Sequence, residues 1–281
     1  MATIECLQVA MKMPSECQTE HNCSNADGDK IDAWVDDFNR DGFLIVREVI
    51  PPDWIEELRE DLDRALEGQE KPGEDDNKGI LLQSRMFEHS AANLRLFDRE
   101  PIVSFAEKVL GTNCHVMHNN SFRTYPGGGI SGWHQDDSPH YLVTHGEPPD
   151  NVLLPCLLFT MNLYLTDVPD ATYGPTECVR GSHLLGRPCP ADPRDSPWSD
   201  RIVPGSGAAG DAVIFNNQVW HHGGPNMSDR VRYITQVSYA RRIIGHKYYP
   251  FMNYVMPEHI YAHAGKRLKR LLGFLPRGAY G

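Results

Sequence analysis

The pattern of hydrophobic positions divides the chain into a helical first part and a strand-rich remainder. In residues 31–42 apolar side chains recur at helical spacing, and Gly42 follows them as a stop signal. Residues 43–50 are a short β-branched run typical of a strand. Helical spacing returns in residues 51–68 and 101–111, which open with proline and close with glycine. The first part therefore predicts three helices and one strand.

The second part, which starts near residue 113, is dominated by strand-like runs. These runs are separated by loops rich in glycine and proline, and they cover residues 114–125, 157–168, 211–215 and 231–242. The βαβ rhythm of a dinucleotide-binding fold is absent, and no repeat is visible. Helices followed by a strand-rich body predict a mainly β fold, a β-sandwich or jelly roll with flanking helices.

Length and composition are those of one globular unit. The 281 residues are 40% hydrophobic, which is enough to build a core. Residues 1–30 precede the first amphipathic helix and show no clear periodicity. We therefore expect a flexible N-terminal tail over residues 1–30 and a single domain over residues 31–281, and we expect removal of about the first 28 residues to leave folding and activity nearly intact.

Charge and cysteine usage exclude several classes of protein. The net charge of −11 argues against a nucleic-acid partner and against binding to an anionic membrane. No apolar run is long enough to cross a membrane, and the N-terminus lacks the features of a secretory signal. Seven cysteines without a CxxC pair predict reduced thiols rather than a disulfide framework. We expect a cytoplasmic protein that acts on a small molecule.

The segment "GWHQDD" concentrates metal-ligating residues. On an extended chain His134 and Asp136 point to one face, while Asp137 points away. A third ligand is available in "VWHHGGPNMSDRVRY", where His221 and His222 point in opposite directions, so that only one of them can bind. Two imidazoles and one carboxylate describe the facial triad of non-heme Fe(II) oxygenases. Catalytic zinc sites use the same ligand types, so the triad alone leaves the metal open.

An arginine in the next strand-like run favours the oxygenase. Such an enzyme must hold the distal carboxylate of 2-oxoglutarate, and the planar guanidinium of Arg232 suits this task. Arg230 is the rival, but it falls in the preceding turn, where a solvated side chain is expected.

Several motifs together resemble the phytanoyl-CoA dioxygenase family. They are "FNRDGFLIVREVIPPDWIEELREDLDRAL", "GWHQDD", "LYLTDVPDATYGPTECVRGSH", "GDAVIF" and "WHHGGPNMSDRVRY", and the resemblance runs from about Ile31 to the C-terminus. It implies a double-stranded β-helix, a cupin-like jelly roll, that uses Fe(II), 2-oxoglutarate and O2. One departure is Arg180 in "VRGSH", where many members have proline.

The resemblance also implies roles for individual residues. It selects His221 as the third metal ligand beside His134 and Asp136, and Arg232 as the cosubstrate clamp. It further places Asn162 and Ser121 at positions that touch the cosubstrate.

The expected reaction is oxidation of an unactivated C–H bond of a small molecule, by default hydroxylation, with release of succinate and CO2. A natural-product intermediate is one such substrate. An alternative is a catalytically silent metal- or ligand-binding β-helix that serves as a sensor or interaction module. A zinc-dependent hydrolase is a third reading, for which no general base stands at a suitable spacing.

Three further residues are expected to line the substrate pocket, namely Arg123, His140 and Tyr141. Arg123 lies in an otherwise apolar strand, two residues from Ser121, and a buried arginine needs an anionic or polar partner. This predicts a substrate that carries a carboxylate or a comparable acceptor. The rival expectation is that Arg123 pairs with a nearby acid and has only a structural role.

Overall fold

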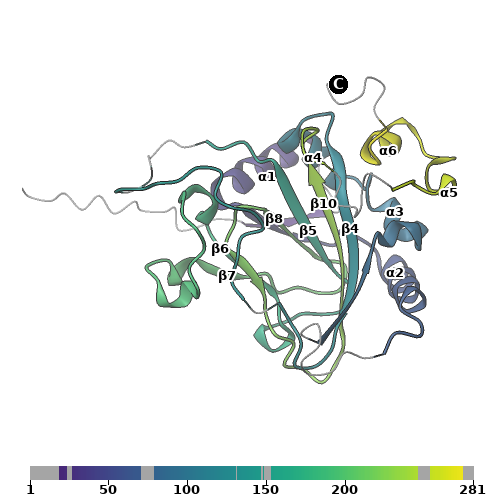
Figure 1. The fold of residues 1–281 in the computed structure, drawn as a ribbon, viewed down its shortest axis with the longest axis horizontal. Helices are drawn as coiled ribbons and strands as arrows, with labels where there is room; N and C mark the ends of the chain where they lie inside the picture. The colour runs from purple at the N-terminus through teal and green to yellow at the C-terminus, as the bar shows by residue number, and fades with distance from the viewer. Residues whose placement is uncertain are drawn as a thin grey trace, which may run out of the picture.

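Two facing β-sheets form the centre of the computed structural model, which describes residues 19–23, 27–70, 79–130, 132–146, 148, 153–245 and 254–274. The large sheet lies between the small sheet and a layer of helices (Figure 1). The strands of the large sheet are, in order across it, β1 (Glu20–Asn22), β2 (Phe43–Arg47), β8 (Ala212–Asn216), β5 (Leu158–Tyr164), β10 (Arg232–Ala240), β4 (His115–Thr124) and β3 (Ile80–Ser84). The small sheet is formed by β7 (Ile202–Pro204), β6 (Thr176–Val179) and β9 (His221–Gly223). This is the predicted jelly roll.

The helices cover the outer face of the large sheet. They are α1 (Gly28–Asp41), α2 (Pro52–Ala65), α3 (Ala91–Arg95), α4 (Ile102–Leu110), α5 (Glu258–Tyr261) and α6 (Lys266–Leu271). Short 3-10 turns occupy Met86–Glu88, Ala171–Tyr173, Ser182–Leu184, Pro193–Asp195 and Ser199–Arg201. In Figure 1 α2 and α3 lie beside β4, on the side of the large sheet away from β6 and β7.

Local signals in the sequence explain the first helix. The side chain of Asp27 accepts a hydrogen bond from the Lys30 backbone N–H (3.1 Å) and caps α1. Gly42 ends the helix with φ of +84°, a conformation that glycine adopts without strain. Trp34 and Phe38 are buried on its inner face, where each contributes roughly 2–3 kcal/mol of hydrophobic stabilisation.

The predicted elements agree with the structure in type. The helices expected at 31–42, 51–68 and 101–111 are α1, α2 and α4, and the strands expected after residue 113 are β4, β5, β8 and β10. The sequence did not signal the short strands β3, β6, β7 and β9, because they lack the continuous apolar runs that mark the five-residue strands β2 and β8.

The prediction of a flexible tail over residues 1–30 is wrong for the part that the structure describes. Strand β1 pairs in parallel with β2, and the Ile45 N–H donates to the Thr19 carbonyl (2.9 Å). His21 meets Asp37 of α1 (3.0 Å), and the side chain of Cys23 is buried in the core. Residues 1–18 and 24–26 lie outside the described part of the chain.

Deletion of residues 1–26 is therefore expected to lower the free energy of unfolding by about 2–4 kcal/mol. The reason is loss of the β1 hydrogen bonds, worth ~1 kcal/mol each, and of the buried Cys23. Urea unfolding of the full chain, of the deletion and of a control lacking only residues 1–18 measures the effect. Equal stability of all three proteins would show that β1 contributes nothing.

Among the described residues, no helix is both long enough and apolar enough to span a membrane. Cys23, Cys114, Cys156, Cys178 and Cys189 are all free thiols, as predicted from their number and spacing. Cys6 and Cys17 lie outside the described residues.

Candidate active site

The loop at residues 132–137 and strand β9 bring three predicted ligands together. His134 and His221 form an antiparallel bridge in which each backbone N–H donates to the other residue's carbonyl (2.9 and 2.8 Å). The Asp136 Oδ1 atom lies 3.9 Å from His134 Nε2 and 3.7 Å from His221 Nε2. All three ligand atoms lie within 4.8 Å of one another. One metal ion can contact all of them after small side-chain movements.

Both imidazoles are oriented for ligation through Nε2. The Nδ1 atom of His134 hydrogen-bonds the Gly132 carbonyl (2.8 Å), and Nδ1 of His221 hydrogen-bonds the Val219 carbonyl (2.8 Å). A carbonyl only accepts, so each Nδ1 carries the proton and each Nε2 presents a lone pair. Burial lowers the pKa of His221, which favours the neutral form that binds a metal.

The neighbouring residues His222 and Asp137 point away from this cluster, as strand parity predicts. His222 Nε2 contacts the Glu177 carboxylate (2.6 Å), and its ring stacks on Trp133 with centroids 4.1 Å apart. The hydrogen bond from His222 lowers the pKa of Glu177. Asp137 accepts a hydrogen bond from the Ser138 N–H (2.8 Å) and is exposed. Neither residue can join the three ligands without rebuilding its surroundings.

A cavity of about 210 Å³ between the two sheets connects the metal cluster with Arg232. Phe122, Phe215 and Ile234 form its apolar walls, and Asn162 and Thr176 add polar groups. Arg232 is 5% exposed, and burial lowers its pKa to about 10. Its guanidinium donates to backbone carbonyls, including that of Gly224 (3.0 Å). Among the described residues no carboxylate contacts Arg232, so its charge is available for an anion.

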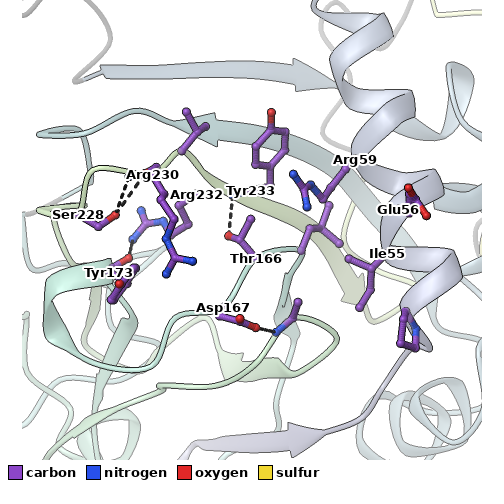
Figure 2. A pocket seen from close by; sticks show the side chains of 14 residues that line it. Ile55, Glu56, Arg59, Thr166, Asp167, Tyr173, Ser228, Arg230, Arg232 and Tyr233 are labelled. Carbon is purple, nitrogen blue, oxygen red and sulfur yellow. Dashed lines mark hydrogen bonds between the residues drawn. The ribbon is translucent and has the colours of Figure 1, made fainter.

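Arg230 is placed differently, as the sequence predicts. It is exposed, and its guanidinium lies over the Tyr173 ring at 4.7 Å from the centroid. Figure 2 shows both arginines near Tyr173, in the wall of a surface groove of about 710 Å³ outside the two sheets. Of the two, only Arg232 also lines the cavity that contains the metal cluster.

Of the two residues predicted to touch the cosubstrate, one faces the cavity and the other does not. Asn162 faces the cavity, where it accepts from the Gln236 amide (3.0 Å) and donates to Thr176 Oγ1 (3.1 Å). Ser121 faces the opposite side of the large sheet, where its hydroxyl bonds Thr235 Oγ1 (2.7 Å) beneath α3. The prediction that Ser121 touches the cosubstrate is wrong, because its side chain points toward the helices.

Strand parity carries Arg123 to the same outer face as Ser121. Its guanidinium pairs with Asp63 of α2 (3.2 Å), so the structural rival, pairing with an acid, is the observed one. The prediction that Arg123 orients a substrate carboxylate is therefore wrong. Tyr141 is also placed elsewhere: its hydroxyl donates to the Leu184 carbonyl and anchors a loop. His140, in contrast, lines a second cavity that adjoins Asp136.

The sequence reasoning overlooked several polar residues around the metal cluster. Gln236 lies on the same face of β10 as Arg232 and lines both cavities. The periodicity of two along β10 was a usable signal for it. Asn217 holds Asp136 in place, since its carbonyl accepts the Asp136 N–H (3.0 Å). No pattern in the sequence predicts the hydrogen bond between Asp136 and Asn217.

The buried side chain of His183 makes the stability of the fold depend on pH. Its Nε2 hydrogen-bonds the Asn39 carbonyl (3.0 Å), Nδ1 has no partner among the described residues, and burial lowers its pKa from 6.5 to about 4. Below pH 6.5 the unfolded chain binds a proton that the folded chain does not. The free energy of unfolding should therefore fall by about 2–3 kcal/mol between pH 7 and pH 4.5 through this residue. Urea unfolding should show a shallower pH dependence in His183→Gln, and equal slopes would contradict the assignment.

Two facing sheets that enclose a His–Asp–His cluster define the class of cupin-like oxygenases. The family model for "Phytanoyl-CoA dioxygenase (PhyH)" matches residues 38–234, which is more than half of the chain. The chain belongs to the phytanoyl-CoA dioxygenase family and is an oxidoreductase of the dioxygenase type.

Two relatives of this chain are also named as dioxygenases. The dioxygenase cdmA of Talaromyces verruculosus is 22% identical over 69% of this chain and 67% of its own length. The ectoine dioxygenase of Streptomyces coelicolor (strain ATCC BAA-471 / A3(2) / M145) is 29% identical over 56% of this chain. The match spans about half, 53%, of the length of that enzyme.

Solved structures share the fold at low identity. The carbocyclase SnoK from nogalamycin biosynthesis has a TM-score of 0.61 and 20% identity, and the match covers 84% of this chain and 93% of SnoK. The epimerase SnoN, in complex with Fe3+, alpha ketoglutarate and nogalamycin RO, scores 0.59 at 19% identity, with coverages of 77% and 86%. HygX from Streptomyces hygroscopicus, with nickel, 2-oxoglutarate and hygromycin B bound, scores 0.59 at 15% identity, with coverages of 74% and 86%. At such identities the likeness shows the fold alone.

Proposed function

We propose that the protein is a non-heme Fe(II)- and 2-oxoglutarate-dependent dioxygenase that oxidises a C–H bond of a small molecule. The observation that carries the proposal is one cavity with three converging metal ligands and, in its wall, a buried arginine that no acid of the described residues neutralises. Family membership supports the same reaction class.

The residues of the cluster fit an Fe(II) ion. Two neutral Nε2 atoms and one carboxylate supply the ligand types of the facial triad, and their Nδ1 hydrogen bonds fix the ring orientations. When bound, the iron supplies the activation of O2 and the oxidising chemistry, and the protein supplies binding and orientation.

Arg232 would hold the distal carboxylate of 2-oxoglutarate. The cavity walls of Phe122, Phe215 and Ile234 exclude water from its carbon chain, so the ion pair would form in a medium of low polarity. Asn162 and Thr176 lie along the same cavity and offer hydrogen bonds to the cosubstrate. These roles would give the buried Arg232 charge an anionic partner in addition to its hydrogen bonds to backbone carbonyls.

Hydroxylation is the reaction that we propose for the substrate, with succinate and CO2 as coproducts. The neighbours named as an epimerase and a carbocyclase show that this fold also serves other oxidative outcomes. Nogalamycin RO and hygromycin B, bound in two of those structures, support a small natural product as the class of substrate.

The test is anaerobic calorimetry of Fe(II) and 2-oxoglutarate binding, followed by measurement of succinate when O2 is admitted. We expect one Fe(II) per chain, 2-oxoglutarate binding that depends on the metal, and succinate formation. Binding of both without any succinate would instead identify a silent binding protein. Zn(II)-dependent hydrolysis without a requirement for 2-oxoglutarate would contradict the proposal.

A further inference from the structure

A second cavity, of about 330 Å³, adjoins the metal cluster. It shares Asp136 and Gln236 with the cavity that contains Arg232, but Arg232 is not part of its wall. The proposed metal site therefore stands between a compartment that suits the cosubstrate and a separate compartment. A substrate C–H bond can approach the metal only from a space that borders it, so the second cavity is the place for the substrate.

Three consecutive amide residues begin at the last residue of β8, and the middle one has an unsatisfied side-chain oxygen. Asn216 Oδ1 accepts the Gln218 N–H (3.0 Å), while the Gln218 side chain accepts the His140 N–H (2.8 Å) and donates to the Ser138 carbonyl (3.2 Å). Asn217, between them, lines the second cavity and is 6% exposed, yet its Oδ1 atom has no hydrogen-bond partner among the described residues. A buried carbonyl without a partner is costly, which indicates that a ligand provides the missing donor.

Other polar groups in this cavity also have acceptors left over. The Asn120 amide nitrogen is bonded to His118 Nδ1 (3.2 Å), and the Gln236 amide nitrogen is bonded to Asn162 (3.0 Å). One N–H of each amide is bonded within the protein, and no described residue donates to the side-chain oxygen of Asn120 or of Gln236, so each oxygen can accept from a ligand. The Thr160 hydroxyl is bonded to Ser238 (2.8 Å), and either oxygen can be the donor.

The charged residues around the second cavity also favour a ligand that is not an anion. The described residues around the second cavity include two carboxylates, Asp136 and Asp137, and neither lysine nor arginine. Met117, Leu158 and Ile244 add an apolar side. With Asp136 bound to the metal, Asp137 would be the remaining carboxylate, and no lysine or arginine of the described lining would pair with an anionic ligand, whereas a hydroxyl or ammonium group would find acceptors.

We infer that the substrate is a neutral or cationic small molecule that donates hydrogen bonds, through hydroxyl or amino groups, to Asn217 and to the Asn120 and Gln236 carbonyls. Its hydrocarbon part lies against Met117, Leu158 and Ile244. An acyl-CoA thioester or a free carboxylate does not fit this lining. The inference rests on the proposed function, because it takes the metal cluster as the site of oxidation.

The test compares ligands of opposite charge, first in a pair of similar size and then in a pair of larger molecules. The protein is loaded with Mn(II) and 2-oxoglutarate without O2, and proton line broadening reports ligands that bind near the metal. The matched pair is trans-4-aminocyclohexanol and trans-4-hydroxycyclohexanecarboxylate, and hygromycin B and palmitoyl-CoA form a second, larger pair. A Zn(II)-loaded sample is the diamagnetic control.

We expect the amine of each pair to be broadened and to bind at least about tenfold more tightly than the anion. Equal or tighter binding of the carboxylate or of palmitoyl-CoA overturns the inference, and so does failure of both amines to bind. Calorimetry of Mn(II) and 2-oxoglutarate binding to the same sample distinguishes failure of the proposed function from failure of the inferred substrate class. If these do not bind, the proposed function fails; if they bind and the ligand order is reversed, only the substrate class fails.

Variants of Asn216 and Asn217 test whether the Asn217 side chain contacts the ligand. Asn217→Leu should weaken binding of the amine about tenfold without lowering the Tm of the ligand-free protein, because it removes an unsatisfied carbonyl. Asn217→Asp keeps an acceptor and should preserve amine binding. Asn216→Leu is the matched structural control and should lower the Tm, since its Oδ1 has a partner. A lowered Tm in Asn217→Leu with unchanged ligand affinity would show that Asn217 has only a structural role.

Discussion

Replacing any one of His134, Asp136 and His221 by alanine is expected to lower Fe(II) affinity by more than about 100-fold and to abolish succinate formation. Loss of a residue that merely orients a ligand already costs 10- to 100-fold in metal affinity, and loss of the ligand itself should cost more. The three ligand atoms lie within 4.8 Å of one another, so no single replacement leaves a complete facial set. Anaerobic calorimetry with Fe(II) measures the affinity, and circular dichroism checks that each variant is folded.

The adjacent residues provide matched controls for this experiment. Asp137→Ala should bind Fe(II) like the wild type, because Asp137 is exposed and bonds only within its own loop. His222→Ala should also keep the metal, although it leaves Glu177 without its His222 partner and is expected to lower stability. Loss of iron in His222→Ala, with iron retained in His221→Ala, would reverse the assignment of the third ligand.

The metal cluster could be predicted because its geometry is local. His134 and Asp136 are separated by one residue, and the alternation of an extended chain shows that only one of His221 and His222 can join them. The resemblance to the family selected His221. The helices α1, α2 and α4 could also be predicted from the sequence, because each combines an apolar stripe with a proline or glycine boundary. Such signals need no knowledge of how distant segments pack.

The errors concern relations that the chain establishes only on folding. Alternation correctly put Ser121 and Arg123 on one face of β4, but it did not say which face meets the metal. The answer depends on α2 and α3, whose Asp63 and Asn93 receive these two side chains. Strand β1 was overlooked for a similar reason: its three residues are a strand only because β2 offers a free edge.

Asn217 illustrates the same limit at the substrate cavity. Its side chain is distinguished from those of Asn216 and Gln218 only by the lack of a partner, and a lack of partners cannot be read from sequence. The corrected position of Arg123 also changes the chemistry expected of the substrate. Once that arginine is paired with Asp63, the described cavity lining contains no cation that calls for a substrate carboxylate.

Replacing Arg232 by leucine is expected to weaken 2-oxoglutarate binding by about 2–5 kcal/mol, roughly 30-fold to a few thousand-fold, while Fe(II) affinity is retained. The carboxylate would enter a cavity walled by Phe122, Phe215 and Ile234 with no cation to receive it. The metal ligands do not contact Arg232, so their geometry should survive. Calorimetry of Fe(II), and then of 2-oxoglutarate on the Fe(II)-loaded protein, separates the two effects.

Two further arginine variants decide whether position and shape matter as well as charge. Arg230→Leu should bind 2-oxoglutarate like the wild type, because Arg230 is exposed and lines only the outer groove (Figure 2). Arg232→Lys should recover only part of the affinity, because an ammonium group is a point charge and cannot bind a carboxylate through a planar pair of N–H groups. Unchanged 2-oxoglutarate affinity in Arg232→Leu, together with a large loss in Arg230→Leu, would place the cosubstrate in the outer groove. The cost of burying the Arg232 charge would then be offset only by its hydrogen bonds to backbone carbonyls.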